Sequence, residues 1–111
     1  MAIPHAVSGQ PVIVLPLANS PGERQTVALF KTNELEVMRV VLPTGKSMPA
    51  HKVAGDITVQ CLEGSVAVVS EESTTAQILE AGELMYLNGG VVHSLTGIKD
   101  ACVLVHIVLR K

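Results

Sequence analysis

Residues 45–64 read GKSMPAHKVAGDITVQCLEG, and this stretch contains the strongest structural signal in the chain. Its first half has a glycine and a proline typical of a loop and contains one histidine, His51. Its second half is an apolar segment that ends at Gly64 and predicts a strand. A second stretch has similar features at residues 82–93, GELMYLNGGVVH, which begins with glycine and ends at His93. The two stretches together predict paired strand-and-loop units that each present one histidine.

The composition favours one all-β domain. The chain has 111 residues, of which 48% are hydrophobic but only 2% aromatic, so Val, Leu, Ile, Ala and Met must build the core. β-Branched residues suit a pleated sheet better than a helix. No segment longer than a turn has the apolar spacing of a helix, and turn signals recur about every 8–12 residues. We therefore expect about nine or ten short strands in a sandwich or barrel.

The domain organisation is predicted to be an N-terminal arm, residues 1–18, followed by a barrel domain, residues 19–111. In the arm, Pro11 and Pro16 bracket four apolar residues, which indicates an edge strand in PVIVLPL because proline cannot donate to a ladder. Residues 43–49 are expected to form a loop. The sequence further predicts tight turns at residues 63–65 and 96–100, each separating two strands.

Charge and cysteine usage exclude some partners and compartments. The formal net charge is −2 and the basic residues are scattered, so nucleic acid is not an expected partner. The longest apolar run is far short of the ~20 residues that span a bilayer, and no secretory signal is visible, so we expect a cytoplasmic protein with no membrane partner. Cys61 and Cys102 are expected to be buried free thiols, although a disulfide between two strands stays open.

The spacing of the glycines and histidines resembles the two motifs of the cupin superfamily. The first cupin motif is Gly, five residues, His-x-His, three or four residues, Glu, six residues and Gly. This chain has Gly45, His51, Val53, Ile57 and Gly64 at those places. The second motif is Gly, five residues, Pro-x-Gly, two residues, His, three residues and Asn; here the corresponding residues are Gly82, Asn88, Gly90, His93 and Gly97. The resemblance implies an all-β jelly-roll barrel, also called a double-stranded β-helix.

The same resemblance implies a metal site that has lost part of its ligand set. In metal-binding cupins, two histidines and a glutamate of the first motif join the histidine of the second motif. His51 and His93 match two of these ligands, whereas Val53 and Ile57 replace the other two and cannot bind a metal. Two imidazoles alone make a weak site.

Gln60 is the candidate for a third ligand. Regular strand alternation places it on the face away from Ile57, although a bulge would reverse this. The run HKVAGDITVQCLEG also resembles a subfamily of small cupins that has His and Gln at the positions of His51 and Gln60. We therefore expect His51, Gln60 and His93 to hold a divalent metal loosely, with Zn, Ni, Fe and Mn as candidates. Tyr86 is expected to contact a ligand at the barrel rim.

These features predict a small-molecule-binding protein with a ligand at the barrel mouth and a weakly held divalent metal. The alternative is a metal-free binding or sensing module whose apolar mouth holds an apolar or carbohydrate-like ligand. A purely structural partner protein is a third hypothesis, and the sequence leaves open whether a reaction is catalysed. By analogy with small cupins, and because a Val-rich sheet leaves apolar area to bury, we expect a homodimer. Asp56 is a further carboxylate near the mouth, and His106 is interpreted as a core or interface histidine.

Overall fold

The computed structural model describes residues 5–15 and 26–109, and within these ranges the elements of regular secondary structure are all β-strands. Seven strands follow one another, and every pairing between them is antiparallel. They are β1 (Val27–Lys31), β2 (Leu35–Leu42), β3 (Ser47–His51), β4 (Ile57–Ser70), β5 (Gln77–Glu80), β6 (Leu84–Leu87) and β7 (His93–Val108). The described residues contain no helix that is long and apolar enough to cross a membrane. The predicted all-β class is confirmed.

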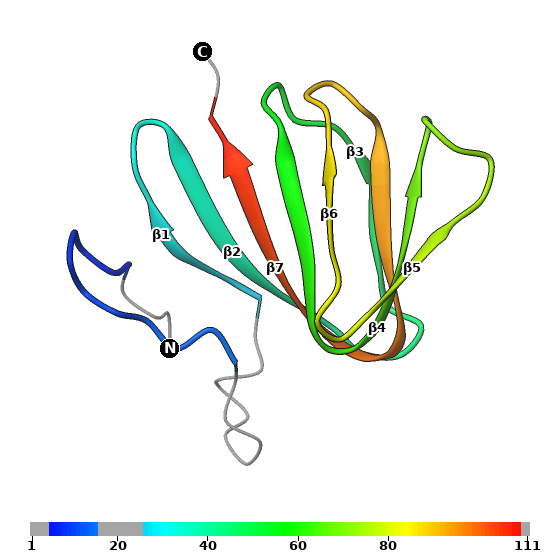
Figure 1. Cartoon of the computed structure of the whole chain (residues 1–111), viewed down its shortest axis with the longest axis horizontal. Helices are drawn as coiled ribbons and strands as arrows, with labels where there is room; N and C mark the ends of the chain where they lie inside the picture. Colours follow the sequence, from blue (N-terminus) through cyan, green and yellow to red (C-terminus); the bar gives the residue numbers. More distant parts are fainter. Residues whose placement is uncertain (1–4, 16–25, 110–111) are drawn as a thin grey trace.

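The long strands β4 and β7 connect two sheets (Figure 1). The second half of β7 lies between β2 and the first half of β4, and β1 and β6 complete this first sheet at its two edges. The first half of β7 lies between β3 and the second half of β4, and β5 completes the second sheet. The register shifts between Cys61 and Val66, where β4 passes from one sheet into the other. This arrangement is a jelly roll.

The turns predicted at residues 63–65 and 96–100 are wrong, because both lie inside continuous strands. At Gly64 the backbone takes a φ of 69°, and a Cβ there would meet the main-chain oxygens of Lys99 and Asp100. The glycine therefore lets the strand bend sharply against β7 rather than reverse. The loop predicted at residues 43–49 is also partly wrong, since β3 begins within it. The described residues contain seven strands rather than the predicted nine or ten, because β4 and β7 each continue through a position where a turn was expected.

The arm packs against the first sheet without joining it. Residues 11–15 form no strand, so the edge strand predicted in PVIVLPL is wrong for these residues, while residues 16 and 17 and the predicted boundary at 18/19 lie outside the described residues. Val12 and Val14 pack on a small cluster of Leu29, Val37 and Leu104 on the outside of the sheet. Side-chain burial therefore holds this segment. Two hydrogen bonds add to it, from Ala6 N to Leu29 O at 3.0 Å and from Arg39 Nη1 to Ile13 O at 3.4 Å.

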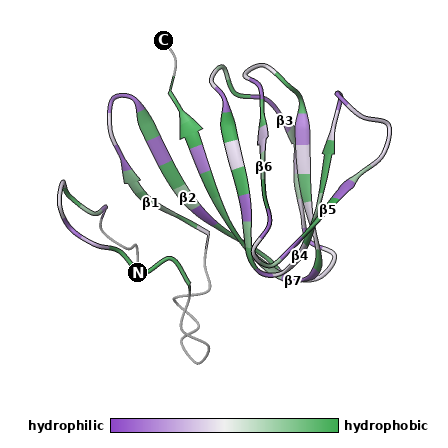
Figure 2. Ribbon diagram, viewed as in Figure 1, coloured by the Kyte–Doolittle hydropathy of each residue, from purple (hydrophilic) through white to green (hydrophobic). Residues whose placement is uncertain are grey.

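The main core fills the space between the two sheets. Buried residues alternate with more exposed ones over residues 57–61 of β4 and 93–97 of β7. Figure 2 shows hydrophobic and hydrophilic bands alternating along several strands. The buried members are Val40, Leu42, Ile57, Val59, Cys61, Val66, Val68, Leu79, Leu87, Leu95, Ala101, Val103 and Val105. Cys102 alternates with Ala101 and Val103 and so points to the other side of the sheet from Cys61. Both cysteines are buried and neither forms a disulfide, which settles the open disulfide question.

Candidate functional site at the barrel mouth

His51 and His93 lie side by side at one end of the barrel. His51 ends β3, His93 begins β7, and the two residues are cross-strand partners. Their ring centroids are 4.5 Å apart, with the planes tilted by 54°. The loops of residues 52–56 and 88–92 lie at the same end, which is the upper edge of Figure 1 and is here named the mouth. The structure thus brings together the two histidines that the motifs singled out.

Both imidazoles are anchored in the same way. The Nδ1 atom of His51 lies 3.0 Å from Pro49 O, and that of His93 lies 2.9 Å from Val91 O. A carbonyl oxygen can only accept, so each Nδ1 must carry the hydrogen. In the neutral ring, Nε2 then holds a lone pair, and neither Nε2 atom hydrogen-bonds to a described residue. The mouth therefore contains two oriented acceptors that can also act as metal ligands or proton acceptors.

The loops around the histidines are fastened to each other. Asp56 Oδ1 accepts a hydrogen bond from Gly89 N at 2.9 Å, and Gly90 N donates to Val53 O at 2.7 Å. A Cβ at Gly89 would meet Ala54 O, so this close approach requires glycine. Asp56, which the sequence placed near the mouth, thus braces one loop against the other. His51 and His93 therefore lie next to two loops that hydrogen bonds hold together.

The positions of the missing metal ligands are filled by hydrocarbon. Ile57 is 4% exposed and belongs to the core between the sheets, and the half-buried Val53 packs against that core. The described residues contain no group of three His, Cys, Asp or Glu side chains that could hold an ion together. Two imidazole donors fall short of the three protein ligands that catalytic metals usually have. The residues present therefore do not fit a tightly held metal.

Gln60 and Tyr86 point away from the histidine pair. Gln60 alternates with the buried Val59 and Cys61 on β4, so it lies on the outer side of the first sheet. Tyr86 is 68% exposed on β6 and shares that outer side, opposite Thr58. Regular alternation holds at Gln60, because the register shifts in β4 begin only after Cys61. The structure therefore does not bring Gln60 or Tyr86 together with His51 and His93.

His106 also belongs to the outer side. Its Nδ1 atom shares a 3.0 Å hydrogen bond with Thr58 Oγ1 on the neighbouring strand. His106 is interpreted from the sequence as a core or interface histidine, and this hydrogen bond shows that its side chain has a partner within the chain, while a role in an interface stays a prediction.

Cys61 is chemically protected. Its thiol donates to Glu63 O at 3.3 Å and lies 3.5 Å from Gly64 O. Burial raises the pKa of the Cys61 thiol above its ordinary value, and the negative charge of Glu80 adds to the increase. A thiol that stays protonated is a poor nucleophile. Cys61 is therefore part of the packing and not a reactive group.

A small hollow of about 210 Å³ lies directly beside His93. It is lined by Ala50, Val69, Ser70, Glu71, Val92, His93 and Ser94. The Glu71 carboxylate accepts a hydrogen bond from Val92 N at 3.1 Å, so it is held at the edge of this hollow. Pockets for drug-sized ligands run from about 300 to 1,000 Å³, so this hollow suits a smaller molecule.

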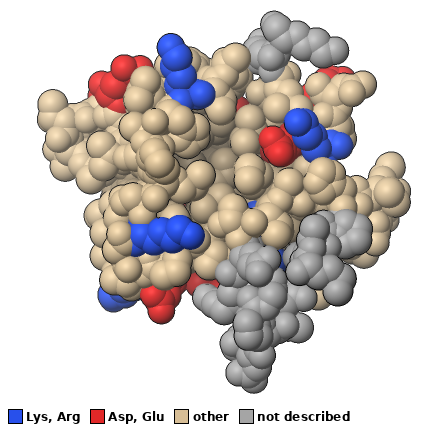
Figure 3. Space-filling view, turned by 180° about the vertical axis from the view of Figure 1, so that it is seen from behind, with Lys and Arg blue, Asp and Glu red and all other residues tan. Residues whose placement is uncertain are grey.

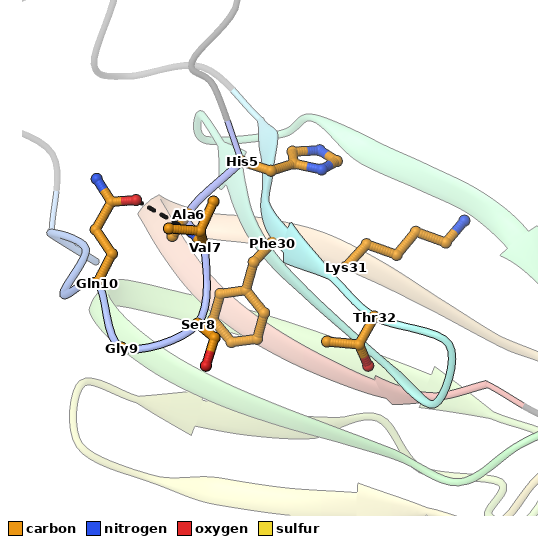
Figure 4. A pocket seen from close by; sticks show the side chains of 9 residues that line it. All are labelled: His5, Ala6, Val7, Ser8, Gly9, Gln10, Phe30, Lys31 and Thr32. Atoms are coloured by element: carbon orange, nitrogen blue, oxygen red, sulfur yellow. Dashed lines mark hydrogen bonds between the residues drawn. The ribbon is translucent and has the colours of Figure 1, made fainter.

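A larger hollow of about 660 Å³ separates the arm from β1 (Figure 4). Its walls are residues 5–10 and 30–32, and the Phe30 ring lies between the arm and Thr32. Lys31 extends away from the arm, so the hollow has no converging set of charged groups. The sequence carried no signal for it, because it depends on how the arm rests on the sheet.

Charged side chains are isolated on the surface drawn in Figure 3. The blue and red groups there stand singly or in small sets, separated by wide uncharged areas. That side of the molecule therefore presents no continuous charged surface.

Solved structures with this arrangement come from several bacteria and an archaeon. A cupin superfamily protein from Desulfitobacterium hafniense matches with a TM-score of 0.75 and 14% identity, over 99% of this chain and 100% of that one. A conserved protein of unknown function from Streptococcus pyogenes gives 0.74 and 16%, over 100% and 96%. An RmlC-like cupin with a double-stranded β-helix fold from Methanocaldococcus jannaschii gives 0.72 and 16%, over 89% and 91%. No family model matches the sequence, and no curated protein matches it either.

Proposed function

Since the chain has the fold of the cupin superfamily, a double-stranded β-helix, we propose that it binds a small molecule at the mouth through His51 and His93. The observation that carries the proposal is the repeated anchoring of Nδ1 on a carbonyl two residues earlier, with the two rings 4.5 Å apart. Two rings anchored in the same way at one end of the barrel suit a common ligand.

The chemistry of the mouth restricts the ligand. Both Nε2 lone pairs accept hydrogen bonds, and the Glu71 carboxylate nearby is also an acceptor. The ligand must therefore donate, through hydroxyl or N–H groups. The half-buried Val53 offers hydrocarbon in place of a polar group, whereas Ile57 is buried in the core. A small molecule with adjacent hydroxyl groups and an apolar carbon face, such as a sugar or short polyol, satisfies both conditions. Two buried cysteines that form no disulfide support a reducing compartment such as the cytoplasm.

The proposal is tested by ligand-observed NMR with a panel of monosaccharides and short polyols. We expect at least one member of the panel to bind the wild-type protein and to lose binding in His51→Leu. His5→Leu is the matched control, because His5 is an exposed histidine on the arm. Binding that persists in His51→Leu would contradict the role of the pair, and a panel without any binder would contradict this ligand class.

A loosely held divalent metal is the second candidate for the same two rings. The carbonyl on Nδ1 is the outer partner that metal-ligating histidines commonly have, and it leaves Nε2 for an ion. Without a third protein ligand we expect weak binding. In a zinc titration, the imidazole ¹⁵N signals of His51 and His93 should shift only at a large excess of zinc. Signal shifts that are complete at one equivalent of zinc would contradict the expected weak binding.

A further inference from the structure

β1 lies at one edge of the first sheet, and its residue Lys31 directs both backbone polar groups away from the sheet. Among the described strands, only β2 pairs with β1. The next residue along the chain, Thr32, donates from its backbone N to Leu35 O at 2.7 Å, and this bond points toward β2. Because successive residues of a strand direct their N–H and C=O groups to opposite sides, those of Lys31 point away from β2. Neither group hydrogen-bonds to a described residue.

The free backbone groups of Lys31 face the hollow of about 660 Å³ between the arm and β1 (Figure 4). Lys31 is one of the residues that line this hollow. The arm follows the same edge of β1, where Ala6 N donates to Leu29 O, but it makes no such bond at Lys31. The arm therefore covers the edge at Leu29 and leaves it open two residues later. The volume lies within the range of about 300–1,000 Å³ that small-molecule pockets have.

The turn of residues 7–10 keeps the arm from closing onto this open edge. Gln10 N donates to Val7 O at 2.9 Å, and Val7 N donates to Gln10 Oε1 at 3.1 Å. Gly9 permits the turn with a φ of 85°. Because these polar groups bond to each other, they do not bridge the hollow to Lys31. Beyond the turn, Val12 and Val14 hold the arm on the small cluster outside the sheet.

Phe30 supplies an aromatic surface beside the free groups. Its ring is half-buried and packs against the small cluster, which fixes its position. Figure 4 shows the ring between the arm and Thr32, whose hydroxyl oxygen already accepts from the backbone N atoms of Glu34 and Leu35. The Lys31 side chain extends away from the arm. The hollow thus combines one aromatic ring with one backbone donor and one backbone acceptor, without converging charged groups.

We propose that this hollow binds an uncharged, planar aromatic amide. An amide has one donor and one acceptor side by side, which are complementary to the N–H and C=O groups of Lys31. A flat ring joined to the amide packs against the ring of Phe30. A charged ligand would lose its hydration here without gaining a counter-charge. The hollow shares no residue with the mouth, so the two binding proposals stand or fall separately.

The test follows the binding of benzamide through the backbone ¹H and ¹⁵N signals of the protein. We expect benzamide at millimolar concentration to shift the amide signals of Lys31 and of residues 6–9, with the Lys31 proton moving downfield as it gains a hydrogen bond. Methyl benzoate is the control ligand, because it keeps the ring and a carbonyl group but has no N–H to donate to Lys31 O. It should bind about threefold to tenfold more weakly, which is the effect of one lost hydrogen bond.

Two variants of Lys31 separate its backbone from its side chain. Lys31→Pro removes the N–H, and proline is tolerated at a sheet edge where this group faces away from the partner strand. It should weaken benzamide binding by about threefold to tenfold or more. Lys31→Ala is the matched control and should bind like the wild-type protein, because it keeps both backbone groups.

A second pair of variants tests the ring. Phe30→Leu should weaken benzamide binding, because it removes the aromatic surface. Tyr86→Leu should leave binding unchanged, although it removes a ring that is 68% exposed on β6, at the other edge of the same sheet.

Each outcome counts for or against the aromatic amide site. An unchanged Lys31 signal at high benzamide concentration would overturn it, as would equal binding of benzamide and methyl benzoate. Loss of binding in Lys31→Ala would assign the contact to the ammonium group, and loss in Tyr86→Leu would assign it to another surface; either result overturns the proposed site. If Lys31→Pro does not fold, the comparison of the two compounds on the wild-type protein decides alone.

Discussion

If the chain lacks a tight metal site because Val53 and Ile57 stand at two ligand positions, metal-binding side chains at these positions should restore the site. Val53→His together with Ile57→Glu would place two further donors beside His51 and His93, because Val53 and Ile57 occupy the positions where metal-binding cupins have ligands. A set of three imidazoles and one carboxylate is a complete zinc site. We expect the double variant to bind zinc tightly and the wild-type protein to bind it weakly.

The size of the effect follows from the burial of Ile57. Its side chain is 4% exposed, so removing it forfeits about 1.5–3 kcal/mol of hydrophobic stabilisation. The unpaired buried carboxylate brings the total cost without metal to about 3–5 kcal/mol. At about 4–8 °C per kcal/mol, Tm should fall by roughly 12–40 °C. Zinc at about 1,000 times its Kd would return about 4 kcal/mol.

The assay is thermal unfolding followed by circular dichroism, with zinc and with a chelator. The double variant should regain most of its lost Tm when zinc is added, and the wild-type Tm should change little. Val53→His alone is the fallback if the double variant does not fold, because three imidazoles also suffice for a zinc site. The reasoning is refuted if zinc stabilises the wild-type protein equally, or if neither variant responds to zinc.

Three further changes test the packing around the site. Because burial and Glu80 raise the pKa of Cys61 above the ordinary 9.0, the folded thiol should resist alkylation at neutral pH. Above about pH 9 the unfolded thiol ionises and the folded one does not, so the free energy of unfolding measured with denaturant should fall; a flat profile would contradict this. Gly89→Ala should lower the free energy of unfolding, measured with urea, by about 1–3 kcal/mol, because its Cβ would meet Ala54 O. An unchanged free energy of unfolding would show that the loop can shift to accept a side chain. Arg39 is buried, and its Nε and Nη2 atoms hydrogen-bond to no described residue. Arg39→Met should therefore leave the unfolding free energy unchanged or raise it by about 1–4 kcal/mol, and a clear loss would reveal a counter-charge.

The glycine spacing predicted the barrel because those positions have a physical requirement. Gly45, Gly64, Gly82 and Gly90 all take positive φ, with values from 69° to 95°. Residues with a side chain rarely adopt this backbone conformation, so glycines at fixed offsets indicate where the chain changes direction. What it did not reveal is whether a chain bends or ends there. At Gly64 the strand continues into the second sheet, which depends on contacts with residues far away in the sequence.

Side-chain direction was predictable only where alternation stays regular. Counting from Ile57 correctly placed Gln60 on the outer side of β4, whereas the resemblance to another subfamily favoured a role with the histidines. The pairing of His51 with His93 followed from the motifs, and their shared anchoring did not, because it depends on the local backbone at Pro49 and Val91. The arm shows the opposite case, in which an apolar segment packs well but makes no ladder.

The metal content of the purified protein tests the account of the mouth most directly. Inductively coupled plasma mass spectrometry on protein prepared without added metal, after dialysis against buffer, counts the ions retained per chain. Because His51 and His93 have only Val53 and Ile57 beside them where ligands would be needed, the account predicts far less than one transition metal ion per chain. One tightly retained ion per chain, lost in His51→Leu, would contradict it.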